Sequence, residues 1–265
     1  MLIQRLLTAS IAGTAFGFAM FAMPAPAWGC AIALMIGIAA WEWAALGGVA
    51  HRASRLAFSA VVASACLTFA LIPAAAAALR WPAYLGAALF WLVFVPAWGL
   101  SGWRRFPVGI HLPAGIITLV PLWFAMSDLQ RDPLELLSLL AVVWVADSAA
   151  YFAGRRFGRR KLAAAVSPGK TWEGVAGAIV GVGVYFSLLS LIVPAMVGRV
   201  GHVALGVLVM AMALLSVEGD LFESAVKRRA GVKDSGSLLP GHGGVLDRID
   251  GWMAALPLAG WWIGS

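Results

Sequence analysis

Long apolar runs follow one another along almost the whole chain, and each is separated from the next by a short polar or basic stretch. An α-helix needs about 20 residues to cross the hydrocarbon core of a bilayer. The pattern therefore predicts an all-α, polytopic transmembrane helical bundle with about nine spanning helices. The predicted spans are the opening stretch after Arg5 and residues 29–49, 56–78, 83–101, 107–126, 133–153, 172–196, 201–223 and 249–264.

The opening stretch has two interpretations. A basic residue, an apolar run and the triplet Ala25-Pro26-Ala27 are typical of a secretory signal peptide with its cleavage site. The alternative is a first spanning helix that is not cleaved. We favour the helix, because further spanning segments follow at once and because Pro26 falls within the cleavage triplet.

Composition agrees with a membrane protein. Apolar residues make up 62% of the 265 positions, while charged residues make up 12%, about half the share typical of a soluble domain. Nine spans would use about 180 residues and leave room only for short loops. We therefore predict a single integral membrane domain over residues 1–265. Cys30 and Cys66 lie inside apolar runs, which indicates small core residues rather than a metal site or a disulfide framework.

The basic residues are distributed unequally between the two sides of this layout. With the N-terminus inside, sixteen Lys and Arg residues fall inside and only Arg80, Arg131 and Arg199 fall outside. Membrane proteins carry such an excess in their cytoplasmic loops, so the C-terminus is predicted outside. The net charge of +7 is then explained by these loops and by anionic lipid headgroups. No interleaving of aromatic and basic residues indicates nucleic acid as a partner.

Two connections, residues 154–171 and 224–248, are long, basic and predicted to be cytoplasmic. Loops of this length in compact bundles usually have a function. The first contains Gly169-Lys170-Thr171, but it is not a P-loop, because position 164 is Ala rather than Gly and no strand is expected before it. Lys170 is expected to contact either a phosphate or a lipid headgroup at the membrane surface.

The acidic residues are few and unevenly placed. Six of the twelve lie between Glu218 and Asp250, and the first 127 residues contain only Glu42. Asp147 lies within an apolar run, where a carboxylate is costly and normally has a partner. Its role is either a helix–helix hydrogen bond or ion pair, or a contact in a functional site.

The acidic cluster near the end of the chain predicts a metal site. Asp220, Ser224 and Lys227 share one helical stripe with Glu223, and Asp247 and Asp250 stand one turn apart where the last apolar run begins. Carboxylates delivered from neighbouring helices suit Mg²⁺. The alternative is simple charge balance against the neighbouring arginines, which does not explain the glycine-rich segment between the basic and acidic residues.

That segment, Gly241-His242-Gly243-Gly244, can expose consecutive backbone amides to phosphate oxygens. The cations Lys227, Arg228 and Lys233 lie nearby in the sequence. For His242 a phosphate contact is favoured over a role as metal ligand or general base. Phosphates, cations and paired carboxylates together indicate metal-assisted phosphoryl or nucleotidyl transfer.

The run SAVKRRAGVKDSGSLLPGHGGVLDRID, residues 224–250, resembles the signature of the phosphatidate cytidylyltransferases, or CDP-diacylglycerol synthases. Residues 147–162, 167–174 and 218–224 resemble further motifs of this family. The likeness covers the C-terminal half, about 131–265, which we expect to be catalytic, whereas the helices of about 1–130 match only in hydropathy and in the WEWA run at 41–44. Ser148-Ala149 departs from the Thr-Gly of the family pattern but keeps a hydroxyl and a small residue.

The resemblance implies the reaction CTP + phosphatidate → CDP-diacylglycerol + pyrophosphate in a bacterial inner membrane. The distribution of basic residues predicts that the active site faces the cytoplasm. The resemblance also implies Mg²⁺, a second cation such as K⁺, and a homodimer. The residues expected to be catalytic are Asp220, Lys227, Arg228, Lys233, Asp234, Asp247 and Asp250, of which Asp220, Asp247 and Asp250 would hold the metal. The residues expected to bind substrate are Asp147, Lys170, Ser224, His242, Gly243, Gly244 and Arg248.

Two other functions fit part of the pattern. A transporter or ion channel also has intramembrane carboxylates, but it would be expected to distribute them through both halves of the chain. Another lipid-directed CTP enzyme, such as a polyprenol kinase, would share membrane helices and CTP.

Overall fold

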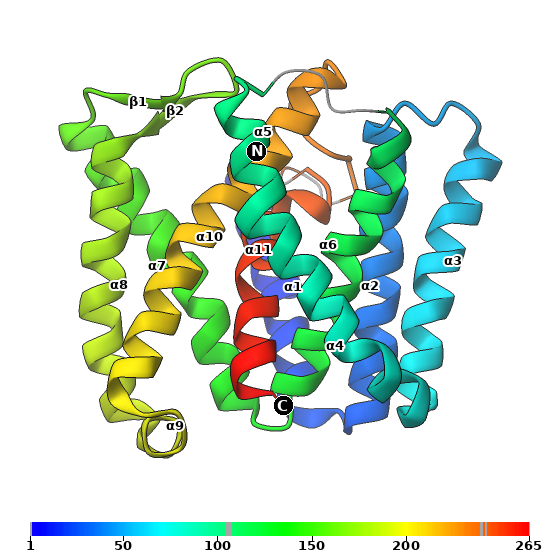
Figure 1. Cartoon of the computed structure of the whole chain (residues 1–265), viewed down its shortest axis with the longest axis horizontal. Coiled ribbons are helices and arrows are strands. Elements are labelled where there is room, and N and C mark those ends of the chain that lie inside the picture. The colour runs from blue at the N-terminus through cyan, green and yellow to red at the C-terminus, as the bar shows by residue number, and fades with distance from the viewer. Residues whose placement is uncertain (1, 104–107, 239–240, 242, 265) are drawn as a thin grey trace.

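The computed structural model describes residues 2–103, 108–238, 241 and 243–264. The chain forms an all-α bundle whose long helices run roughly alongside one another (Figure 1). The elements are α1 (Leu2–Ala22), α2 (Ala25–Leu46), α3 (Arg52–Leu71), α4 (Pro73–Leu89), the π-helix η1 (Phe90–Phe94), α5 (Val95–Leu100), α6 (Val108–Leu129), α7 (Pro133–Phe157), β1 (Lys161–Ala163), β2 (Ser167–Thr171), α8 (Trp172–Ile192), α9 (Pro194–Val200), α10 (His202–Arg229) and α11 (Leu246–Ile263).

Seven helical segments among the described residues are long and apolar enough to span a membrane. They are α2, α3, the continuous segment from α4 through α5, α6, α7, α8 and α10. In a bilayer every backbone amide must find its partner within the protein, which is why these apolar runs are helical. The all-α polytopic architecture is confirmed, while the count of nine spans stays a prediction.

Prolines mark where several helices begin, and one of them corrects a predicted boundary. Pro73 is the first residue of α4, a position where its missing N–H costs no hydrogen bond. The predicted spans 56–78 and 83–101 placed this break too late, because residues 73–78 look as apolar as the helix before them. The helix then continues through Pro82, and η1 joins α4 to α5.

Two polar connections also differ from the prediction. β1 and β2 pair as an antiparallel hairpin, so Lys170 lies on a strand that leads directly into α8, where no strand was expected. The glycine spacing still excludes a P-loop. The second connection is shorter than the predicted 224–248, because α10 continues to Arg229 and α11 begins at Leu246.

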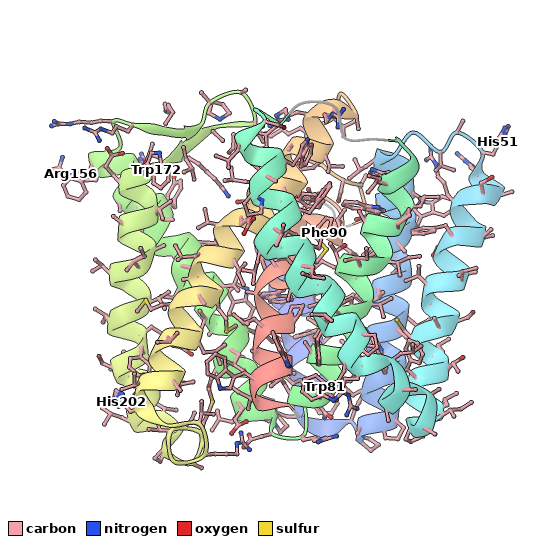
Figure 2. The ribbon with its side chains drawn as sticks, in the orientation of Figure 1. His51, Trp81, Phe90, Arg156, Trp172 and His202 are labelled. Carbon is pink, nitrogen blue, oxygen red and sulfur yellow. The ribbon has the colours of Figure 1, made fainter. Side chains whose placement is uncertain are left out.

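The bundle has two polar ends. The hairpin end carries the β1–β2 hairpin and residues 230–238, which follow α10, and the α9 end carries α9 and the end of α11 (Figure 1). In Figure 2, Arg156 and Trp172 lie at the hairpin end, whereas Trp81 and His202 lie at the α9 end. The two long basic connections therefore share one end of the molecule, as the charge pattern predicted.

Small residues let the helices that surround the site approach closely. A Cβ atom at Gly177 or Gly181 of α8 would collide with Ala153 or Ala149 of α7. These two glycines therefore pack helices within one chain. A Cβ atom at Gly219 of α10 would collide with the carbonyl oxygen of Asp250 in α11. The aspartates that flank this crossing, on α10 and α11, are thereby brought to one place.

Candidate active site

A cavity of about 490 Å³ lies at the hairpin end, bounded by α7, the hairpin, α8, α10 and α11. Four predicted carboxylates from three helices line it: Asp147, Asp220, Asp247 and Asp250. Three cations, Arg155, Lys170 and Arg248, also line it. The remaining wall comes from residues that include Tyr151, Ser167, Thr171 and Val217. Residues that the sequence places about 100 positions apart therefore face one polar chamber.

Lys170 contacts Asp220 across this chamber. Its Nζ lies 2.7 Å from Oδ2 of Asp220 and donates a hydrogen bond to the carbonyl oxygen of Val217 at 3.2 Å. The other oxygen of Asp220 accepts a hydrogen bond from Ser224 Oγ at 3.2 Å. The strand β2 positions Lys170 for this contact, because Thr171 next to it caps α8 by accepting a hydrogen bond from the Gly174 amide. Lys170 is thus a cavity residue rather than a residue of the outer surface.

Asp247, in the first turn of α11, is held from two sides. Its Oδ1 lies 2.6 Å from Nζ of Lys227. Its Oδ2 accepts hydrogen bonds from the amide and hydroxyl of Ser235 and from the Gly244 amide, at 2.8 to 3.0 Å. These contacts give the carboxylate one orientation on the cavity wall.

Lys227 was expected to contact phosphate, but its side chain lies behind the cavity wall. It is buried, and its Nζ contacts Glu223 as well as Asp247. Among the described residues its charge is therefore directed to two carboxylates, and it is absent from the cavity wall. The structure supports a role for Lys227 in orienting Asp247.

Asp147 and Asp250 differ from Asp220 and Asp247 in having no ion pair. No Lys or Arg of the described part of the chain lies within 4.0 Å of either carboxylate. Oδ1 of Asp250 accepts a hydrogen bond from the adjacent Gly251 amide. Both therefore add carboxylate oxygens to the cavity wall that no ion pair of the described residues engages.

Several other predicted residues lie outside the cavity wall. Arg228, Lys233 and Asp234 are exposed, and a guanidinium N–H of Arg228 donates to the carbonyl oxygen of Val232. Gly243 adopts a φ of 82°, and the Gly244 amide is engaged by Asp247. The two glycines thus let the chain close around Asp247. His242 lies outside the described residues.

One residue of the site was missed by the motif analysis. Glu42 of α2 is 4% exposed and accepts hydrogen bonds from the amides of Val245 and Leu246. The available signals were its position as the only acid in the first 127 residues and the weak WEWA match. Neither signal indicates which distant segment the carboxylate meets.

The donor set suits Mg²⁺ in chemistry, since four carboxylates outnumber the three cations on the cavity wall and oxygen ligands are the ones that Mg²⁺ prefers. Within the described ranges, no group of three or more His, Cys, Asp or Glu residues is already gathered as a metal site. Asp220, Asp247 and Asp250 remain the residues that could hold one, and Asp147 lines the same chamber.

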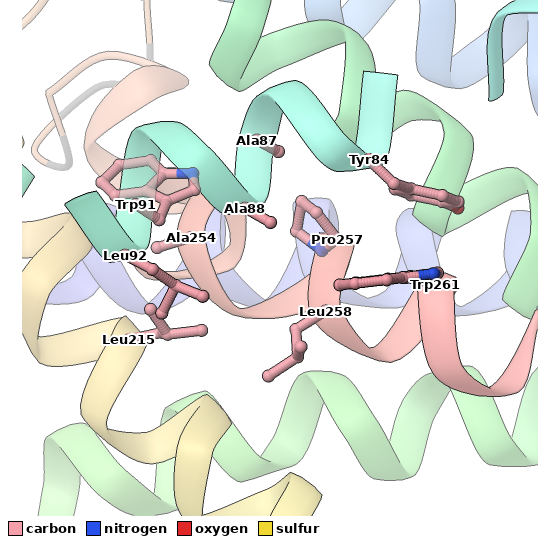
Figure 3. A pocket seen from close by; sticks show the side chains of 10 residues that line it. All are labelled: Tyr84, Ala87, Ala88, Trp91, Leu92, Leu215, Ala254, Pro257, Leu258 and Trp261. Carbon is pink, nitrogen blue, oxygen red and sulfur yellow. The ribbon is translucent and has the colours of Figure 1, made fainter. Parts of the chain in front are cut away.

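A second pocket lies between α4, η1, α10 and α11 and has a volume of about 20 Å³ (Figure 3). Its wall is almost wholly apolar, with Tyr84, Trp91, Leu215, Pro257 and Trp261 among its residues. It offers no cluster of titratable groups. The chemistry of the molecule is therefore concentrated in the cavity at the hairpin end.

Comparison with known proteins finds relatives of this chain. The model of the Cytidylyltransferase family matches residues 3–263. The phosphatidate cytidylyltransferase of Pseudomonas aeruginosa is 36% identical across 98% of this chain and 99% of its own length. The enzyme of the same name from Haemophilus influenzae is 44% identical over 58% of this chain and 57% of its own length. That from Thermotoga maritima is 44% identical over 46% of each chain.

Proposed function

Because this chain belongs to the cytidylyltransferase family, we propose that it catalyses CTP + phosphatidate → CDP-diacylglycerol + pyrophosphate. The observation that supports the proposal most directly is the cavity lined by four aspartates and three cations at one end of a membrane-spanning bundle. A lipid phosphate can enter such a chamber while its acyl chains stay among the apolar helices. The transporter and channel alternatives have no comparable support.

The reaction joins two anions, so its main requirement is charge neutralisation. An oxygen of the phosphatidate phosphate attacks the α-phosphorus of CTP in line, and pyrophosphate leaves. Lys170, Arg155 and Arg248 line the chamber and would take part of the phosphate charge. The nucleophile is already an anion, so the reaction needs no strong general base.

We propose Mg²⁺ as the cofactor, held by Asp220, Asp247 and Asp250, with a second cation such as K⁺. Bound there, the metal would neutralise charge that develops on the transferred phosphate and the leaving group. The residues of this chain orient those carboxylates: Ser224 and Lys170 contact Asp220, and Ser235, Gly244 and Lys227 contact Asp247.

The finer assignments are proposals as well. We propose that the protein lies in the cytoplasmic membrane of a bacterium, that the hairpin end faces the cytoplasm and that the enzyme is a homodimer. The sixteen-to-three distribution of basic residues supports the orientation.

The test of the reaction uses purified full-length protein in detergent with phosphatidate, radiolabelled CTP and Mg²⁺, followed by separation of the lipid products. A labelled CDP-diacylglycerol that requires phosphatidate and Mg²⁺ is expected. Release of pyrophosphate without a labelled nucleotide-bearing lipid would contradict the proposed transfer.

The orientation is tested by placing single cysteines at Val232 and Gly198, which are exposed at opposite ends, in a background where Cys30 and Cys66 are replaced by Ser. A membrane-impermeant maleimide applied to intact cells should label Gly198→Cys and spare Val232→Cys until the cells are opened. Labelling of both variants from outside would contradict this topology.

A further inference from the structure

Glu42 is a buried carboxylate that the reaction scheme does not use. It lies near the end of α2, is 4% exposed, and has no Lys or Arg within 4.0 Å among the described residues. A buried charge without a cation is costly unless hydrogen bonds satisfy its oxygens. The groups that satisfy Glu42 therefore indicate what it is for.

Both oxygens of Glu42 bind the start of α11. Oε1 accepts a hydrogen bond from the Val245 amide at 3.0 Å, and Oε2 accepts one from the Leu246 amide at 2.8 Å. The first amides of a helix have no partner within the helix. Val245, the residue before α11, offers no side-chain cap, so Glu42 caps this helix from about 200 residues away in the sequence.

The same carboxylate connects to Asp247 through Ser235. The Ser235 hydroxyl lies 3.0 Å from Oε2 of Glu42 and 3.0 Å from Oδ2 of Asp247. A Cβ atom at Gly236 or Gly244 would collide with the Glu42 carboxylate. Glycine at these two positions therefore allows the backbone to approach the carboxylate closely. Ser235 and Gly244 thereby lie between the two carboxylates.

We propose that Glu42 is a positioning residue for the reaction: it holds Ser235 and residues 244–246 so that Asp247 keeps its orientation on the cavity wall. The proposal rests on the proposed function for its catalytic consequence. Lys227 contacts Oδ1 of Asp247. Among the described residues, the three donors to Oδ2 come from Ser235 and Gly244, which Glu42 holds in place. The helices of the N-terminal half thus contribute directly to the geometry of the site.

The main variant is Glu42→Gln. It keeps the size of the side chain but replaces one acceptor oxygen with an NH₂ group that faces backbone or hydroxyl donors. Loss of a residue that orients a site carboxylate typically lowers activity 10- to 100-fold. We expect kcat to fall by about this factor with a smaller change in the KM for CTP.

The matched control is Glu135→Gln. Glu135 is also 4% exposed and lies in α7, but it pairs with Arg199 at the α9 end, away from the cavity. Its replacement should leave kcat per folded molecule unchanged. Hydrogen–deuterium exchange provides the second measurement: the amides of residues 243–247 should exchange faster in Glu42→Gln and at the wild-type rate in Glu135→Gln.

Ser235→Ala tests the same link if Glu42→Gln does not fold. It should lower kcat several-fold and speed exchange over residues 243–247, and the Glu42→Gln/Ser235→Ala double variant should be no slower than Glu42→Gln. Wild-type kcat and exchange in Ser235→Ala, or equal losses in Glu42→Gln and Glu135→Gln, would overturn the proposal. If wild-type protein makes no CDP-diacylglycerol, the proposed function fails, while the exchange rates still decide whether Glu42 holds this segment.

Discussion

At the α9 end of the bundle Asp128 and Glu135 each pair with an arginine, whereas at the hairpin end only some of the carboxylates have a cationic partner among the described residues. Asp128 lies 3.0 Å from Arg80 and accepts a hydrogen bond from Tyr84, and Glu135 pairs with Arg199. On the cavity wall, Asp147 and Asp250 have no ion pair among the described residues.

The contrast is between carboxylates that each pair with one arginine and a cluster of four aspartates of which two have no ion pair among the described residues. A carboxylate in a membrane protein is expensive, so one that serves only packing is neutralised by a partner. A site that must receive a metal cation keeps carboxylates available until the metal binds. The unequal charge balance of the two ends, rather than burial alone, is what indicates the active site.

The largest expected effect is at the hairpin end. Asp220→Asn and Asp247→Asn keep the size of the side chain and remove its charge, so each should abolish nearly all product formation. Activity is measured with phosphatidate and radiolabelled CTP, and folding by size-exclusion chromatography in detergent. Substantial activity in both variants at ordinary Mg²⁺ concentrations would rule out the metal assignment.

Lys170→Met should have the next largest effect. Lys170 contacts Asp220 inside the cavity, so its loss should lower kcat by about 10²- to 10³-fold, as removal of a transition-state contact does. The control replaces Arg159, Arg160 and Lys161 with Gln and should raise only the KM for phosphatidate. Steady-state kinetics in mixed micelles distinguish the two. If Lys170→Met changed only the KM and the triple variant lowered kcat, the roles assigned to Lys170 and to residues 159–161 would be reversed.

Asp147→Asn should reduce turnover less than the changes at Asp220 and Asp247. Asp147 lines the cavity without a cation and is not among the proposed metal ligands. Its replacement removes negative charge from the chamber but leaves those ligands in place. Rates measured across a range of Mg²⁺ concentrations test this order, and a loss equal to that of Asp220→Asn would add Asp147 to the metal ligands.

Asp128→Asn should have the smallest effect on catalysis. It removes the charge that Arg80 and Tyr84 contact at the α9 end, and a hydrogen bond to a charged group contributes about 1.5–3 kcal/mol to stability. A thermal melt followed by tryptophan fluorescence should show a lower Tm, while kcat of the folded protein stays at the wild-type value. A large loss of kcat without a change in Tm would contradict the distinction between the two ends.

Hydropathy and motif spacing predicted much of this protein. Apolar runs of spanning length form helices because a bilayer leaves backbone amides no other partner. The spacing of Asp220, Ser224 and Lys227 placed them on one helical stripe, and Ser224 does donate a hydrogen bond to Asp220. Boundaries were less predictable, since the break at Pro73 and the hairpin at residues 161–171 lie in stretches whose local pattern also fits other structures.

Only the tertiary structure decided which partners meet. Lys170 pairs with Asp220, Lys227 is buried between Glu223 and Asp247, and Glu42 caps α11. In a membrane protein, the helix faces that meet lipid and those that meet other helices are both apolar, so hydropathy does not indicate which helices are neighbours. The contact between Glu42 and the start of α11, about 200 positions apart, depends on which helices are neighbours. It also depends on glycines that allow the backbone to approach the carboxylate closely.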